Sequence, residues 1–282
     1  MDNLLIGCLG LGAILVLLAL RVPIAITLIS VSLAGIYSIV GERAAIGSLK
    51  TIPYEFVAHW SLSAIPMFLL MGAVAFNAGI VSSIYKAARL WLAGLPGGLA
   101  IASNFACAGF AAASGSSVAT SSAMGRIAVP EMLKFKYDKG LATGVVAAAG
   151  TLGSLIPPSI LMVLYGTFAE ASISKLMIAG IIPGILTAGI YAVMIAARCK
   201  INPELAPPVD FKPSWNERFA SLRDVWPMPL LILGVIGGLY SGIVTATEAG
   251  ALGAFLSIVI AAGYRRLTWD VMLQSIKDTL YG

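Results

Sequence analysis

The stretch "AAAGTLGSLIPPSILMVLYG" (residues 147–166) places glycine, serine, threonine and two adjacent prolines in the middle of an otherwise apolar run. Proline lacks a backbone N–H and clashes with the preceding turn, and glycine lowers helix propensity. A helix through this run is therefore predicted to break near Pro157 and Pro158. If the run enters a bilayer, its broken backbone must lie inside protein or beside water, because lipid cannot satisfy its polar groups.

The composition indicates that the surroundings are indeed lipid. Of 282 residues, 59% are hydrophobic and 11% are charged, whereas ordinary soluble domains are about 25% charged. Several apolar runs approach the roughly 20 residues that a helix needs to cross a bilayer. These runs are Leu4–Leu20, Pro23–Val40, Ile65–Ile80, Leu141–Phe168, Ile173–Ala197 and Pro229–Tyr264. The sequence predicts an all-α integral membrane protein.

The charges and cysteines exclude several other classes of function. The net charge is +5, but the basic residues lie in the connections between apolar runs and do not alternate with aromatics, so no nucleic-acid partner is expected. Cys8, Cys107 and Cys199 are far apart and are interpreted as small hydrophobic residues. With His59 as the single histidine and no paired carboxylates inside the runs, the chain is not expected to be an enzyme.

The basic connections also predict the topology. If they all face the cytoplasm, the chain must leave and return on one side between Arg89 and Arg126. This interval of about 36 residues is short for two full crossings, which need about 40. A re-entrant hairpin that turns at the serines of "ASGSSVATSSA" (113–123) fits better. Alternating the membrane sides backward from a cytoplasmic Arg89 places Met1 outside. Met1 is expected to stand at the start of an uncleaved first helix.

Two clusters of small polar residues thus fall within the membrane region, at the hairpin tip and at the broken helix. Any single serine there is more often a packing residue or bonds to its own helix. Both clusters together favour a binding site, because freed carbonyls and hydroxyls can bind sodium and half-helix N-termini can face an anion. The runs that begin at Leu4 and at Pro229 each have a short break before a second apolar segment, which is how an inverted repeat would start.

These features resemble a known family, the large membrane subunit (DctM type) of tripartite ATP-independent periplasmic (TRAP) transporters. The resemblance covers nearly the whole chain, which would correspond to the N-terminal two-thirds or so of a family member. It rests on the following segments: "IPMFLLMGAVAFNAGI" (65–80), "LPGGLAIASNFACAGFAAASGSSVATSSAMGRIAVPEM" (95–132), "YDKGLATGVVAAAGTLGSLIPPSILMVLYG" (137–166), "IAGIIPGIL" (178–186) and "GLYSGIVTATEAGALGA" (238–254).

The resemblance implies an elevator-type secondary transporter with inverted repeats in the bacterial cytoplasmic membrane. Sodium would be its coupling ion, with no covalent cofactor, and it would import an anionic carboxylate solute. Its partners would be a periplasmic binding protein (DctP type) and a small membrane subunit (DctQ type), besides the lipid bilayer. The implied sodium ligands are Ser114, Gly115, Ser117, Gly150, Thr151 and Gly153. The implied substrate-site residues are Ser116, Thr120, Pro157 and Pro158.

The expected organisation has four parts. Residues 1–90 form scaffold-type helices, and 91–197 form the transport-domain hairpin and broken helix of the first repeat. Residues 198–226 form a cytoplasmic loop, and 227–282 begin a second repeat that this chain does not complete, as in a fragment or a truncated product. Two alternatives remain: a sodium-coupled carboxylate carrier of the same superfamily that needs no binding protein, and a non-transporting membrane scaffold fragment.

Overall fold

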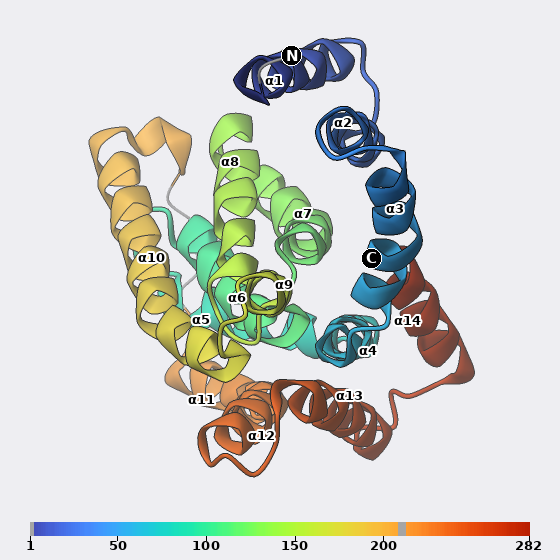
Figure 1. Ribbon diagram of the computed structural model, residues 1–282. Helices are drawn as coiled ribbons and strands as arrows, with labels where there is room; N and C mark the ends of the chain where they lie inside the picture. The colour runs from blue at the N-terminus through green and yellow to red at the C-terminus, as the bar shows by residue number, and fades with distance from the viewer. Residues whose placement is uncertain (1–2, 208–212) are drawn as a thin grey trace. The chain divides into compact units, whose positions relative to one another are not determined.

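The computed structural model describes residues 3–207 and 213–282, and every regular element within these ranges is a helix. The predicted all-α class is therefore confirmed for the described residues. The chain divides into two compact units, Met1–His59 and Trp60–Gly282, whose helices are labelled in Figure 1. Met1, for which an outside location is expected, and residues 208–212 of the expected cytoplasmic loop lie outside the described residues.

The first unit consists of three consecutive helices. They are α1 (Asn3–Ala19), α2 (Ile24–Ile39) and α3 (Glu42–Val57). The chain breaks between α1 and α2 as the proline predicts, with Arg21 at a φ of 61° and Pro23 immediately before α2. Helix α2 packs against both α1 and α3. The stretch 41–61 has a mixed composition without a long apolar run, yet most of it is helical.

The second unit contains the remaining helices. In chain order they are the 3₁₀ turn η1 (Trp60–Ser63), α4 (Ala64–Asn77), α5 (Ile80–Leu92), α6 (Gly98–Ser114), α7 (Ser117–Lys134), α8 (Lys139–Gly150), the 3₁₀ turn η2 (Thr151–Ser154), α9 (Ile160–Phe168), α10 (Ile173–Ile201), the 3₁₀ turn η3 (Pro203–Leu205), α11 (Trp215–Val225), α12 (Pro227–Tyr240), α13 (Ala246–Gly263) and α14 (Trp269–Tyr281).

Helix α6 forms the centre of this unit. It packs against α4, α5, α7, α8, α10 and α12, and most of its side chains are buried. Its sequence, "GLAIASNFACAGFAAAS", is dominated by small residues, which let neighbouring backbones approach closely in membrane proteins. The green hairpin of α6 and α7 lies beside α8 in Figure 1. This packing fixes the end of α6 relative to the broken helix that follows α8.

Three described segments are long and apolar enough to cross a membrane: Trp60–Asn77, Ile173–Ile201 and Ala246–Gly263. Helices α11 and α12 together make a fourth candidate, bent by 43°. The apolar runs at the N-terminus form the shorter helices α1 and α2, and the run 141–168 is divided by its break.

The start of α13 provides a local test of the fold. Glu248 N donates to Thr245 Oγ1 at 3.4 Å, and Thr245 N donates to Glu248 Oε2 at 2.7 Å, which is a capping box. Thr245→Ala should lower the free energy of unfolding by about 1 kcal/mol, which corresponds to about 2–4 °C in the thermal midpoint. Thermal unfolding of the purified protein in detergent measures this change. Ser241→Ala, which removes a hydroxyl outside the box, is the control, and equal midpoints for the two variants would contradict the assignment.

Candidate functional site

The predicted hairpin tip is a two-residue turn between α6 and α7. Gly115 has a φ of 62°, in the left-handed region that favours glycine, and its N–H donates to Ala111 O at 2.9 Å. Ser116 is extended, and its Oγ accepts from Ala119 N at 3.3 Å, so it caps α7. The serines and the glycine of the motif thus turn the chain within two residues.

Two buried hydroxyls hold the tip from inside. The Thr120 hydroxyl donates to Ser116 O at 2.8 Å and lies 3.0 Å from the Ser114 hydroxyl. Thr120 is fully buried and Ser114 is 2% exposed. Because the Thr120 proton is used on Ser116 O, the Ser114 hydroxyl is left to donate to the Thr120 oxygen. The pair therefore fixes the backbone of Ser116 at the tip.

The predicted break in the following helix is confirmed. Helix α8 ends at Gly150, a 3₁₀ turn covers Thr151–Ser154, and α9 begins only at Ile160, after the Pro157–Pro158 pair. Hydroxyls replace some of the missing backbone hydrogen bonds. Ser159 Oγ donates to Ser154 O at 2.9 Å, and Ser154 Oγ donates to Thr151 O at 2.7 Å. The unwound segment is thus held by its own polar side chains.

The tip and the unwound segment are in direct backbone contact. Ile160 N donates to Gly115 O at 2.9 Å. A Cβ added to Gly115 would lie 2.7 Å from Pro158 O, and one added to Gly153 would lie 2.7 Å from the carbonyl carbon of Ser116. Real side chains do not tolerate such distances, so both glycines are required by the approach of the two backbones.

The remaining predicted residues have different surroundings. The Ser117 N–H lies at the same contact, 2.8 Å from where a Gly153 Cβ would be. Gly150 faces Ser121, whose Cα would lie 3.1 Å from an added Cβ. Thr151 is exposed, and its hydroxyl donates to Ala148 O in the last turn of α8 at 2.6 Å. Pro157 and Pro158 are buried.

A cavity of about 280 Å³ lies beside the tip, between α7 and α4. Ser114, Ser116 and Ser122 contribute to its lining on the hairpin side, and Gly72 contributes from α4. Gly72 lets α4 approach the end of α6, because a Cβ added to it would lie 2.6 Å from Ser114 Cα. Gly115, Ser117, Thr120 and the predicted residues of the unwound segment do not line this cavity.

Arg126 also lines the cavity, and sequence reasoning missed it. In the sequence this residue stands in a basic connection between apolar runs, whereas in the structure α7 continues past it to Lys134. Ser122 and Arg126 are four residues apart, so they share one face of the helix. That spacing behind the serine-rich tip is the signal that could have placed Arg126 in the site.

The cavity is completed by α14, which a partly exposed polar contact holds against α4. Asn77 Nδ2 donates to Ser275 Oγ at 3.1 Å and to Asp278 Oδ2 at 2.9 Å. Asp278, which lines the cavity, also accepts from Gln274 Nε2 at 2.9 Å. The cavity therefore combines serine hydroxyls with a guanidinium and a carboxylate that is hydrogen-bonded to neighbouring amides.

Comparison with known proteins identifies the family to which the chain belongs. The family model described as "Tripartite ATP-independent periplasmic transporter, DctM component" matches residues 11–281. The chain belongs to the DctM family. Relatives in this family are named as large permease proteins of TRAP transporters, and this chain has helices long and apolar enough to cross a membrane.

Several curated DctM relatives cover most of the chain. A C4-dicarboxylate TRAP transporter large permease protein of Pseudomonas aeruginosa is 41% identical over 77% of this chain and 50% of its own length. Its counterpart in Vibrio cholerae is 40% identical over 85% of this chain and 52% of its own length. A sialic acid TRAP transporter large permease protein of V. cholerae is 31% identical over 94% of this chain and 61% of its own length. The chain thus spans about half to three-fifths of the length of these DctM relatives.

Proposed function

We propose that this chain is part of a sodium-driven TRAP permease that imports an anionic carboxylate solute. A periplasmic binding protein of the DctP type delivers the solute, and a small membrane subunit of the DctQ type completes the membrane complex. The permease lies in the bacterial cytoplasmic membrane with its N-terminus on the periplasmic side. The family membership supports this proposal, as do the names of relatives that transport C4-dicarboxylates.

The observation that carries the proposal is the cavity beside the hairpin tip. Arg126 supplies a positive charge, and Ser114, Ser116 and Ser122 supply hydroxyls on the same side. A guanidinium forms strong, paired hydrogen bonds with a carboxylate. The Ser116 and Ser122 hydroxyls add donors without a second buried charge, whereas the Ser114 proton is already used on the Thr120 oxygen. The arrangement therefore suits a small solute that presents a carboxylate to the face of α7.

The sodium ion is proposed to bind where the tip meets the unwound segment. Neutral backbone and hydroxyl oxygens are the ligands that broken membrane helices offer to sodium. The proposed ligands are Ser114, Gly115, Ser117, Gly150, Thr151 and Gly153. Of the implied substrate-site residues, Ser116 is proposed to contact the solute directly, while Thr120, Pro157 and Pro158, which do not line the cavity, are proposed to shape the backbone beside it. The backbone contact of Gly115 with Pro158, and of Gly153 with Ser116, supports a shared site, because it makes the two segments move together.

The proposed mechanism is of the elevator type, with the hairpin re-entrant in the membrane and carried by the moving domain. Residues 1–90 are the proposed scaffold, 91–197 the transport part, 198–226 a cytoplasmic connection and 227–282 the start of an inverted second repeat. The order of helices supports the repeat: the apolar helices α1 and α2 precede the more polar α3, as α12 and α13 precede α14.

Uptake into proteoliposomes tests this function. The complete permease, reconstituted with its small subunit and supplied with its binding protein, should accumulate solute when an inward sodium gradient is imposed. The solute is first chosen by a thermal-shift screen of the binding protein against a panel of carboxylates. A potassium gradient of equal size should give no accumulation. Uptake driven by a proton gradient without sodium would overturn the proposed coupling.

The same assay separates the alternatives. Omitting the binding protein should abolish uptake in a TRAP transporter, whereas a carboxylate carrier that binds solute directly would keep it. A membrane scaffold would give no uptake in either case.

A further inference from the structure

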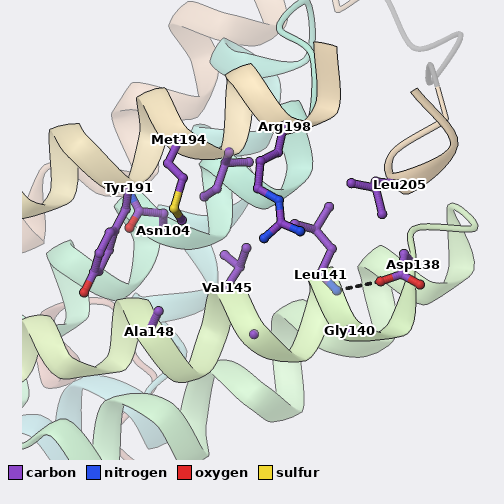
Figure 2. Close-up of a pocket in the computed structure, with 12 residues that line it drawn as sticks. Asn104, Asp138, Gly140, Leu141, Val145, Ala148, Tyr191, Met194, Arg198 and Leu205 are labelled. Atoms are coloured by element: carbon purple, nitrogen blue, oxygen red, sulfur yellow. Dashed lines mark hydrogen bonds between the residues drawn. The ribbon is translucent and has the colours of Figure 1, made fainter. Parts of the chain in front are cut away.

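A second cavity, of about 360 Å³, lies between α8 and α10, with α6 at its base. None of its lining residues also lines the cavity at the hairpin tip. Figure 2 shows it as an elongated space bounded by Arg198 and Asp138 at one end and by Tyr191 and Asn104 at the other. From Tyr191 to Arg198 the helix rises by about 10 Å.

One end of this cavity carries two opposite charges. The Arg198 guanidinium points from α10 toward α8 in Figure 2, and Asp138 stands at the start of α8. The Asp138 carboxylate is fixed in place, because its Oδ1 accepts from Leu141 N at 2.8 Å while its backbone N–H donates to Leu205 O at 2.9 Å. Within the described residues, no ion pair joins Arg198 to Asp138. A ligand that carries both charges can therefore engage both side chains.

The walls between the two ends are apolar and leave the space open. Leu141 and Val145 line it from α8, and Met194 and Ile195 line it from α10. Gly144 leaves this part of the α8 wall without a side chain, and a Cβ added there would meet no atom of the described residues within 4 Å. An apolar body of moderate width thus fits between the helices.

The end of the cavity at Tyr191 and Asn104 is polar, and one of its buried polar atoms lacks a hydrogen-bond partner among the described residues. Asn104 is fully buried, and its Nδ2 donates to Ala188 O at 2.9 Å, but its Oδ1 has no partner within the described part of the chain. A buried polar atom without a partner is costly, so such groups are normally hydrogen-bonded. The Tyr191 side chain extends along the same end (Figure 2). A polar group or a water molecule is therefore expected at this depth.

We propose that this cavity binds one aminophospholipid of the phosphatidylethanolamine type. Its phosphate contacts Arg198, and its ammonium group donates to the Asp138 carboxylate. The glycerol and the first methylenes lie along the apolar walls, and the Tyr191 hydroxyl donates to an ester oxygen. A water molecule at the ester level satisfies Asn104 Oδ1.

The opposite charges of Arg198 and Asp138 favour this lipid over other phospholipids. Arg198 lies in the last turn of a helix long enough to span the membrane, where phosphate groups are found. Asp138 would repel the net negative charge of phosphatidylglycerol. Phosphatidylcholine presents a quaternary ammonium without N–H donors, so it cannot hydrogen-bond to the carboxylate. The zwitterionic headgroup with a primary amine matches both side chains.

Native mass spectrometry of the full-chain permease with its small subunit tests the site. Delipidated complex is mixed with phosphatidylethanolamine, phosphatidylglycerol or phosphatidylcholine of identical acyl chains. One phosphatidylethanolamine molecule should be retained at a concentration about fivefold or more below that needed for the others, as expected for one additional charge contact near the membrane surface. Phosphoethanolamine alone should not compete, because the apolar walls contribute to binding. Preference of the unchanged protein for phosphatidylglycerol, or full competition by phosphoethanolamine, would overturn the assignment.

Matched variants test whether the retained lipid occupies this cavity. Gly144→Leu fills the cavity and should remove the retained lipid, whereas Gly189→Leu on α10, where an added Cβ also meets nothing within 4 Å, should not. Arg198→Gln should weaken retention, while Lys200→Gln, which lies outside the cavity, serves as the charge control. Asp138→Asn keeps a residue able to cap α8 and should shift the preference toward phosphatidylglycerol. Equal retention by both leucine variants would show that the lipid binds elsewhere and would overturn the proposal.

Discussion

Gly153→Ala is expected to reduce sodium-driven uptake by about 100-fold or more, because misplacing a functional group by about 1 Å has effects of this size. The added methyl would lie 2.7 Å from the carbonyl carbon of Ser116 and 2.8 Å from Ser117 N. Backbone at a hairpin tip cannot rotate away as a side chain can. The unwound segment must therefore separate from the tip, and the oxygens proposed to hold sodium separate with it. Initial rates of uptake into proteoliposomes, measured at several sodium concentrations, check this result.

Gly125→Ala is the matched control for this variant. Gly125 lies on α7, and a Cβ added there meets no atom within 4 Å. Both variants add one methyl group to a glycine of the same unit, so only the contact differs. Wild-type uptake and sodium dependence in Gly153→Ala would show that the contact between tip and unwound segment is not needed for transport. Thermal unfolding of both variants separates loss of transport from loss of the folded protein.

Arg126→Gln is expected to raise the concentration of solute-loaded binding protein needed for half-maximal uptake by about 10–100-fold, the range for loss of a charge-assisted hydrogen bond. Arg126→Lys should recover part of this loss, since it restores the charge but not the planar pair of donors. The measurement is sodium-driven uptake as a function of the concentration of solute-loaded binding protein.

Lys134→Gln is the control for the Arg126 variants. Lys134 lies in the last turn of the same helix, is exposed and does not line the cavity. Loss of its charge should leave the concentration dependence unchanged. An Arg126→Gln permease with normal half-saturation would exclude a role for Arg126 in binding the solute.

The break points of the fold could be predicted from local sequence. Pro157 and Pro158 remove backbone donors, and Gly115 permits the left-handed turn at the tip. Each of these residues changes the backbone only within a few positions of itself. Proline alone is an incomplete guide, however, because Pro130 and Pro183 lie inside α7 and α10. The stretch 41–61 was harder to interpret, since its mixed composition shows no long apolar run, yet it contains α3.

The candidate site was predicted in part. Its two segments were found from their clusters of serine, threonine, glycine and proline, which stand out against the apolar sequence around them. Arg126 was missed because a charged residue between apolar runs is usually a loop residue in membrane proteins. Its place in the cavity depends on how far α7 continues and on which side of α7 faces the cavity that it shares with α4, and neither can be read from a single charged residue.

The sequence by itself determined the helical membrane class, the turn at Gly115 and the interruption at the prolines, because apolar content and backbone restrictions act locally. Only the tertiary structure decided that Gly115 O accepts from Ile160 N, that Gly153 lies against Ser116, and that Arg126 lines the same cavity as Ser114. Residues tens of positions apart meet through the packing of whole helices. That packing follows from the small side chains of α6 together with Gly72 of α4, not from any one segment.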